Sequence, residues 1–284
     1  MGNTGKSVCA AVTALVLLAG CTAPTDPAPV DSTTGSAPAP SAPAEETVPA
    51  PVAAALDVVA ADRKDDFSVA VQDNTTGRSW SYNPDARYLE ASLVKVPILL
   101  TLVRQATEED RSLTAEEEEL ATLMIEYSDN EATAELYARL GGRDALDRTY
   151  DLIGVTDTEA GEMWGASETT AGDQVLIART AANGADWLDA DLLAFAVGLM
   201  ENVCPEQNWG ISAGVSSPLT EVALKNGWLP DDDDEWAVGS SGFIRDGERN
   251  YSIAVLSSRN STLSEGIGVV ENVASVINGY EAGA

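Results

Sequence analysis

The sequence has 284 residues, of which 44% are apolar and 22% are charged, a composition typical of soluble globular proteins with a packed core. Its formal net charge of -30 disfavours nucleic acid as a partner, because a surface this negative repels the phosphate backbone. The sequence contains no histidine, which excludes histidine-activated serine and cysteine nucleophiles and the usual zinc sites.

Residues 1–21 have the pattern of a signal peptide. Lys6 gives a positive start, and the apolar run over residues 10–20 is too short to span a bilayer. The run ends Leu-Ala-Gly before Cys21 and resembles a bacterial lipobox, which implies cleavage before Cys21 and a diacylglycerol on its sulfur. We therefore expect an exported protein, anchored by lipid to the extracytoplasmic face of the cell membrane. The alternative is an ordinary secretory signal that contains a cysteine.

Residues 22–50 have the composition of a disordered tether. They are almost entirely Ala, Pro, Ser, Thr, Val and acidic residues, so they cannot bury enough apolar area to fold, and the prolines keep the chain extended. Residues 51–284 then have the pattern of a globular domain. Because Cys9 would leave with the signal and Cys21 would carry lipid, Cys204 has no partner for a disulfide, and we expect it to be a buried apolar side chain.

The helices and strands of the domain are predicted from apolar spacing and turn chemistry. A helix over residues 52–63 precedes strands at 67–72 and 79–82, which are joined by a turn. Helices follow at residues 92–106, 114–127, 131–140, 143–153, 170–183 and 188–203. Strands return at 221–228, 235–245 and 250–257, and a helix over 264–280 ends the domain. This order predicts an α/β (α+β) fold in which the N- and C-terminal strands complete one sheet.

Ser92 and Lys95 are a candidate nucleophile and base at the start of the helix predicted over residues 92–106. Side chains three residues apart share a helix face, and the helix N-terminus offers backbone N–H groups to an oxyanion. Burial in the apolar run around Lys95 can lower a lysine pKa toward neutrality, which lets lysine replace histidine as base. The alternative is a serine N-cap and a lysine that reaches solvent, but the chain has only four lysines and places two in apolar runs.

Ser128, Asp129 and Asn130 form a second candidate group, between the helices predicted over residues 114–127 and 131–140. A serine and an amide in a helix–helix turn can both face a site. Ordinary turn and N-cap chemistry would explain the same residues equally well.

Lys225 begins a third candidate group on the predicted strand over residues 221–228. A lysine on a strand is common at exposed positions, so Lys225 alone does not indicate a site. Gly227 weakens a strand, which predicts that another backbone or a ligand approaches closely there.

The three groups, in this order and on these elements, resemble the active-site motifs of the class A β-lactamase and penicillin-binding protein superfamily. The resemblance covers about residues 51–280. It implies an antiparallel sheet flanked by helices, an all-helical second lobe and a cleft between them, and the short stretch from Lys95 to Ser128 implies a trimmed lobe. We expect no cofactor and a monomer. Its expected partner is a β-lactam or a stem peptide of peptidoglycan, and its only expected contact with the membrane is the lipid anchor.

The roles of five residues are implied by this resemblance. Ser92 would attack a β-lactam or D-Ala-D-Ala-like carbonyl, and Lys95 would take the hydroxyl proton or hold the network that does. Ser128 would relay a proton to the leaving nitrogen, with Lys225 tuning it and attracting the substrate carboxylate. Asn130 would hold a substrate amide and bridge to Lys95.

Residues Asn226, Gly227 and Trp228 are implied to contact the substrate. The backbone N–H groups of Trp228 and Ser92 would form the oxyanion hole. Asn226 departs from the family pattern, in which a hydroxyl residue is usual. Its amide can still donate a hydrogen bond, with a different geometry toward a carboxylate.

A second departure concerns the Ω-loop, where class A enzymes have a Glu-x-x-Leu-Asn segment whose glutamate activates the deacylating water. Residues 140–170 contain no such segment. Glu159, Glu162 and Glu168 are nearby acids that could be the missing base or ordinary loop carboxylates. Because release of the acyl group needs a positioned base, we expect efficient acylation and slow deacylation.

Two rival functions remain open at this point. A non-catalytic sensor lipoprotein would keep the binding site without turnover, and a structural lipoprotein would bind no β-lactam at all. The acidic runs at residues 116–119 and 231–234 lack the ligand spacing of a calcium loop, so no metal site is predicted.

Overall fold

The computed structural model of the protein describes residues 45–61, 66–231 and 233–283. The expected signal peptide, the lipidation site Cys21 and most of the expected tether lie outside the described residues. No helix of the described residues combines the length and the apolar character needed to cross a membrane. The backbone N–H of Glu46 donates to the carbonyl oxygen of Ser79, so contacts with the sheet begin before residue 51.

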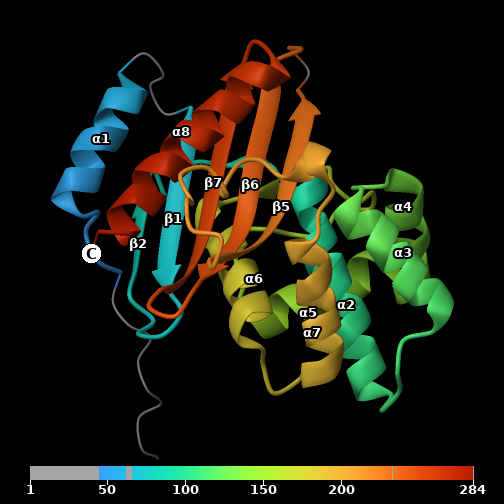
Figure 1. The fold of residues 1–284 in the computed structure, drawn as a ribbon. Coiled ribbons are helices and arrows are strands. Elements are labelled where there is room, and N and C mark those ends of the chain that lie inside the picture. The colour runs from blue at the N-terminus through green and yellow to red at the C-terminus, as the bar shows by residue number, and fades with distance from the viewer. Residues whose placement is uncertain (1–44, 62–65, 232, 284) are drawn as a thin grey trace, which may run out of the picture. The chain divides into compact units, whose positions relative to one another are not determined.

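A five-stranded antiparallel sheet forms the centre of the fold, as the family resemblance implies (Figure 1). Its strands lie in the order β2 (Ser79–Tyr82), β1 (Phe67–Asp73), β7 (Asn250–Asn260), β6 (Trp236–Arg245) and β5 (Glu221–Pro230). In the register of β1 and β7, Val69 pairs with Val255. The prediction that strands from both ends of the domain complete one sheet is therefore confirmed.

Helices cover both faces of this sheet. Helices α1 (Ala50–Ala60) and α8 (Leu263–Glu281) pack together on one face, and α6 (Ala171–Asn183) packs against β1, β6 and β7 on the other (Figure 1). Most positions of β1, β6 and β7 are buried as a result, which explains their nearly continuous runs of apolar and small residues.

The other helices form a second cluster beside β5. They are α2 (Lys95–Glu108), α3 (Ala115–Glu126), α4 (Asn130–Leu140), α5 (Gly142–Ile153) and α7 (Ala190–Glu201). Helix α2 lies among the others, so most of its side chains are buried, and its apolar residues follow one another almost without interruption. Thr114 and Glu117 form a capping box that begins α3.

Short elements connect these layers and were not predicted. A 3₁₀ turn, η1 (Ala91–Val94), precedes α2, so the helix predicted over residues 92–106 is a 3₁₀ turn followed by an α-helix. Strands β3 (Tyr88–Leu89) and β4 (Glu168–Thr169) pair with each other, and a second 3₁₀ turn, η2 (Pro205–Gln207), follows α7. Cys204, before η2, is a free and half-buried thiol, so the prediction that it is fully buried is wrong.

Candidate active site

Ser92 lies on the 3₁₀ turn η1 and is half-buried. In a 3₁₀ turn the side chains of residues three apart eclipse each other, so Ser92 and Lys95 lie on the same side. Ala91, immediately before the serine, has a φ of 48°, which is unusual for a residue other than glycine. Within the described part of the chain the Ser92 hydroxyl makes no hydrogen bond, so it is available to a reactant.

The Lys95 side chain is fully buried and ends among three oxygen atoms. Its Nζ lies 2.7 Å from the carbonyl oxygen of Ser128, 3.0 Å from the Oγ of Ser128 and 2.9 Å from the Oδ1 of Asn130. Burial lowers the pKa of Lys95 to about 8, and the nearby Asp129 carboxylate opposes this by favouring the charged form. The two hydrogens of a neutral amine can go to the carbonyl oxygens, which leaves its lone pair for a hydroxyl proton.

The turn between α3 and α4 presents Ser128 and Asn130 to this amine. Ser128 has a φ of 57°, and Asn130 is the first residue of α4. Between them, the Asp129 side chain caps α4 by accepting from the N–H of Ala132 at 2.7 Å. The N-cap interpretation of the sequence thus holds for Asp129, while its two neighbours face Lys95.

Lys225, on β5, approaches the same hydroxyl from the other side. Its Nζ lies 3.0 Å from the Oγ of Ser128 and 3.0 Å from the carbonyl oxygen of Asn226. Burial holds the pKa of Lys225 well below its usual range, and the positive charge of Lys95 adds to this effect. The Ser128 hydroxyl therefore lies between two amines, an arrangement in which a proton can pass from one nitrogen to the other.

Gly227 is the position at which β5 touches the turn that carries Ser92. A β-carbon at Gly227 would lie 2.9 Å from the amide nitrogen of Leu93. It would also lie 3.0 Å from the amide nitrogen of Ser92 and 3.0 Å from the carbonyl oxygen of Glu90. Only glycine permits this approach, so the prediction of a close backbone neighbour at Gly227 is confirmed. Trp228 follows it and stacks at a tilt on Trp209, with ring centroids 5.9 Å apart.

Asn226 does not reach this group. Its side chain is fully buried, and its Nδ2 donates to the carbonyl oxygens of Gln207 at 2.6 Å and Trp209 at 3.2 Å. Both amide hydrogens are thereby used, which leaves no donor for a substrate carboxylate. The expected contact between the Asn226 side chain and substrate is corrected accordingly: it supports the segment around η2.

The segment between α5 and β4 passes close to Lys95 through Trp164. The Lys95 Nζ lies 5.2 Å from the centroid of the Trp164 ring, within the range of a cation–π contact. Glu159 and Glu162 of this segment and Glu168, the first residue of β4, are all exposed. The Glu162 carboxylate lies 3.6 Å from the Arg143 guanidinium. An aromatic ring, and none of the three candidate carboxylates, covers the amine.

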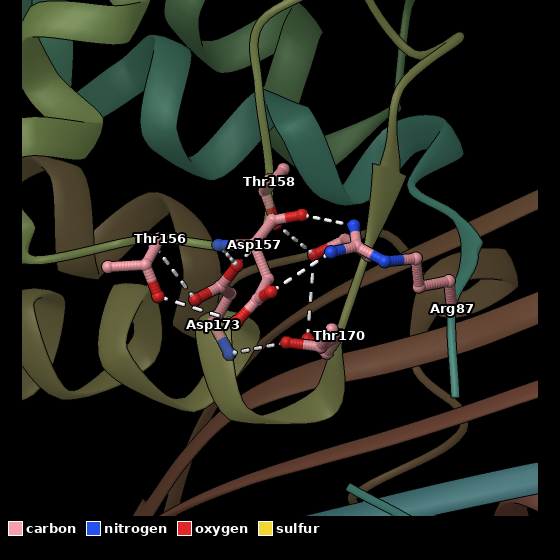
Figure 2. A network of polar contacts seen from close by, with 7 residues as sticks. Arg87, Thr156, Asp157, Thr158, Thr170 and Asp173 are labelled. Atoms are coloured by element: carbon pink, nitrogen blue, oxygen red, sulfur yellow. Dashed lines mark hydrogen bonds and ion pairs between the residues drawn. The ribbon is translucent and has the colours of Figure 1, made fainter. Parts of the chain in front are cut away.

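A polar network holds the first half of this segment against α6 (Figure 2). The buried Asp173 accepts from the N–H of Thr156 at 3.3 Å, from the N–H of Asp157 at 2.9 Å and from the Thr158 hydroxyl at 2.7 Å. Arg87 donates to the side chain of Asp157 at 2.9 Å. These contacts fix the path of the segment in the absence of regular secondary structure.

The structure thus connects Lys95, Ser128, Asn130 and Lys225 by hydrogen bonds, and it places the backbone of Ser92 against Gly227, two residues after Lys225 on β5. Trp164 was not predicted as part of this group, although a lone tryptophan in a polar loop was a signal for it. No three histidine, cysteine, aspartate or glutamate side chains gather in a metal-binding arrangement in the described ranges.

Comparison with known proteins gives one family and many similar folds. A family model described as "Beta-lactamase enzyme family" matches residues 51–118 and 114–280. The sequence has no match among curated proteins. The solved structure of PBP-A is 19% identical, with a TM-score of 0.72, over 85% of this chain and 99% of that one.

Two further solved structures have the same fold. A class A beta-lactamase from Bacteroides cellulosilyticus DSM 14838 is 15% identical, with a TM-score of 0.71, over 81% of this chain and 96% of that one. A mutant of PBP-A, solved as an acyl-enzyme complex with penicillin G, is 19% identical with a TM-score of 0.71, over 85% of this chain and 100% of that one.

Proposed function

Since the chain belongs to the beta-lactamase enzyme family, we propose that it is a penicillin-recognising serine hydrolase that forms an acyl-enzyme on Ser92. The reactant is a β-lactam or a D-Ala-D-Ala-like peptide of peptidoglycan. The observation that carries the proposal is the hydrogen-bonded group of Lys95, Ser128 and Lys225, which offers a base and a proton relay in a chain without histidine.

The acylation step follows from this group. The Ser92 Oγ attacks the carbonyl carbon and gives its proton to the neutral Lys95 amine. The carbon–nitrogen bond of the substrate breaks, and the leaving nitrogen takes a proton from the Ser128 hydroxyl, which is replenished from Lys95. Asn130 orients the substrate amide, and Lys225 attracts the substrate carboxylate.

The negative oxygen of the intermediate accepts hydrogen bonds from the backbone N–H groups of Ser92 and Trp228 in this proposal. The close approach of Gly227 to the Ser92 turn supports it, because it draws the next residue of β5 toward that turn. Loss of such a donor typically costs about 2.7–4 kcal/mol of transition-state stabilisation.

Deacylation is slow in this proposal. Hydrolysis of the acyl group needs a base that positions water, and the three candidate glutamates point into solvent while Trp164 covers Lys95. The acyl adduct should therefore persist.

Labelling with a fluorescent penicillin tests the proposal. The wild-type protein should take up label, which mass spectrometry should find on Ser92, and Ser92→Ala should take up none. Followed over time, the adduct should outlast many acylation half-times, and a chromogenic cephalosporin should be hydrolysed poorly. Fast steady-state hydrolysis would contradict slow deacylation, and a wild-type protein without label would contradict the acyl-enzyme.

A sensor lipoprotein that binds β-lactams without turnover is the second candidate, and the covering of Lys95 by Trp164 favours it. It predicts a stoichiometric adduct with no measurable turnover of β-lactam or D-Ala-D-Ala peptide. We further propose export of a monomer anchored through lipid on Cys21. Replacement Cys21→Ser should then release the protein from the membrane fraction.

A further inference from the structure

Glu90 lies two residues before Ser92 and joins the segments that surround the nucleophile turn. Its backbone N–H donates to the carbonyl oxygen of Ser167 at 2.8 Å, and its own carbonyl oxygen accepts from the N–H of Leu93 at 3.1 Å. The same carbonyl lies against Gly227 of β5. The backbone of Glu90 is thus in contact with the loop before β4, with η1 and with β5.

The Glu90 side chain is fully buried and is fixed by the helices behind the turn. Its Oε1 accepts from the Tyr150 hydroxyl of α5 at 2.9 Å and from the Gln174 Nε2 of α6 at 3.2 Å. Its Oε2 is buried and has no hydrogen-bond partner among the described residues. A buried carboxyl group with one unpartnered oxygen is costly, which suggests that it serves a purpose beyond stability.

The backbone conformation of Ala91 indicates what the buried Glu90 carboxyl group can do. The φ of 48° at Ala91 places a residue with a β-carbon in the left-handed region, which is strained for any residue other than glycine. Such a conformation persists only when the neighbouring residues hold it in place. Ala91 lies between the fully buried side chains of Glu90 and Leu93, and a β-carbon at Gly165 would lie 3.3 Å from the carbonyl oxygen of Ala91.

We propose that Glu90 is a positioning residue for the acylation of Ser92, because its buried carboxyl group holds the strained turn that presents the hydroxyl. The inference rests on the proposed function. It assigns a role to a carboxyl group that touches neither the substrate nor the proton relay.

Burial makes the contribution of the Glu90 carboxyl group sensitive to pH. It raises the pKa of Glu90 to about 8, while hydrogen bonds from Tyr150 and Gln174 oppose that rise and the negative charge of Asp173 adds to it. Of the titratable groups near it, Tyr150 lies on α5, Asp173 on α6 and Tyr137 on α4. None of these is a cation, so above its pKa Glu90 becomes an uncompensated buried charge, and the turn should loosen.

The second-order rate constant of labelling by a fluorescent penicillin, measured between about pH 6 and about pH 10, tests the proposal. In the wild type the rate should rise as Lys95 loses its proton and fall as Glu90 loses its own. Glu90→Gln mimics the neutral carboxyl group, so it should acylate within about threefold of the wild type at neutral pH and lack the falling limb. Glu90→Ala should acylate at least about tenfold more slowly at every pH.

Tyr150→Phe provides a second variant that leaves the carboxyl group in place. It removes a donor that favours the ionised form, so the falling limb should move to higher pH. Glu281→Gln is the matched control, since burial also raises the pKa of this carboxyl group, which lies on α8 across the sheet. Its profile should equal that of the wild type.

The inference is overturned if Glu90→Gln keeps the falling limb at the same pH, or if Glu90→Ala acylates as fast as the wild type. A wild-type protein that takes up no label overturns the proposed function itself, and the two failures are thus distinguished.

Discussion

The two sides of the Lys95 amine differ in how they are built. One side faces α4 and β5 and is a connected hydrogen-bond network. The Lys95 amine donates to Ser128 at 3.0 Å and to Asn130 at 2.9 Å, and the Lys225 amine donates to Ser128 at 3.0 Å. On the side of the loop before β4, the amine meets the ring of Trp164, and the loop carboxylates face solvent. For the proposed function, the difference teaches that the first side offers hydrogen-bonded groups for proton transfer, whereas the second side offers, among the described loop carboxylates, none turned toward the amine.

The largest effect is expected from Lys95→Met, which removes the base and keeps the buried volume. Acylation of the wild type by penicillin should be about 10²–10⁴-fold faster than acylation of this variant, the usual contribution of a general base. Stopped-flow labelling measures the rate, and thermal unfolding shows whether the variant is folded. A folded variant that still acylates rapidly would mean that Lys95 is not the base for acylation.

A smaller loss is expected from Gly227→Ala, because the added methyl group would collide with backbone atoms of the Ser92 turn. Acylation should fall about 10²-fold as β5 moves away, and the free energy of unfolding should fall by about 1–3 kcal/mol. Gly247→Ala is the matched control, since a β-carbon there meets no atom within 4 Å. Equal effects of the two replacements would contradict the close packing at Gly227.

Asp173→Asn probes the loop side, where the main expected change is in stability. The amide cannot accept from all of the donors of Thr156, Asp157 and Thr158, so the free energy of unfolding should fall by about 1–3 kcal/mol. Chemical denaturation measures this loss, and limited proteolysis should show cleavage within residues 154–168. An unchanged stability would show that the network does not anchor the loop.

The smallest effect is expected from Trp164→Ala, which exposes the Lys95 amine. Because burial is the main cause of the lowered pKa of Lys95, the pKa should rise, and acylation at neutral pH should slow by about threefold to tenfold. The rate should recover at higher pH, where the amine is again neutral. Trp164→Phe should keep the wild-type pH profile, and a rate loss that no increase in pH restores would contradict this role.

Much of this fold follows from local sequence patterns. The helix starts at Thr114 and Thr170 follow from capping residues, and the long strands follow from apolar runs between turns. Strands β3 and β4 have two residues each, too few for any periodicity, so they could not be predicted. Likewise, apolar spacing does not distinguish the 3₁₀ turn at Ser92 from the first turn of an α-helix.

The site is less completely encoded in local patterns. The motifs predict Lys95, Ser128 and Lys225 as members of one group, and the alternation of side chains along a strand separates Asn226 from them. Side chains of neighbouring strand residues point to opposite faces, so if Lys225 faces Ser128, Asn226 must face away. The contact of Trp164 with Lys95 depends on how the loop folds back over α2, and no local pattern determines that path.

The pairing of β1 with β7 has a consequence for how the protein folds. Phe67 pairs with Ser257, so the middle of the sheet joins strands from opposite ends of the domain. Bringing such distant segments together costs loop-closure entropy before any strand contact repays it. During synthesis β1 is made long before β7 and therefore has no pairing partner at first. The contacts within the helical cluster are local, so this cluster can form earlier. We therefore expect the helices to acquire structure first and the sheet to close last, after β7 has left the ribosome.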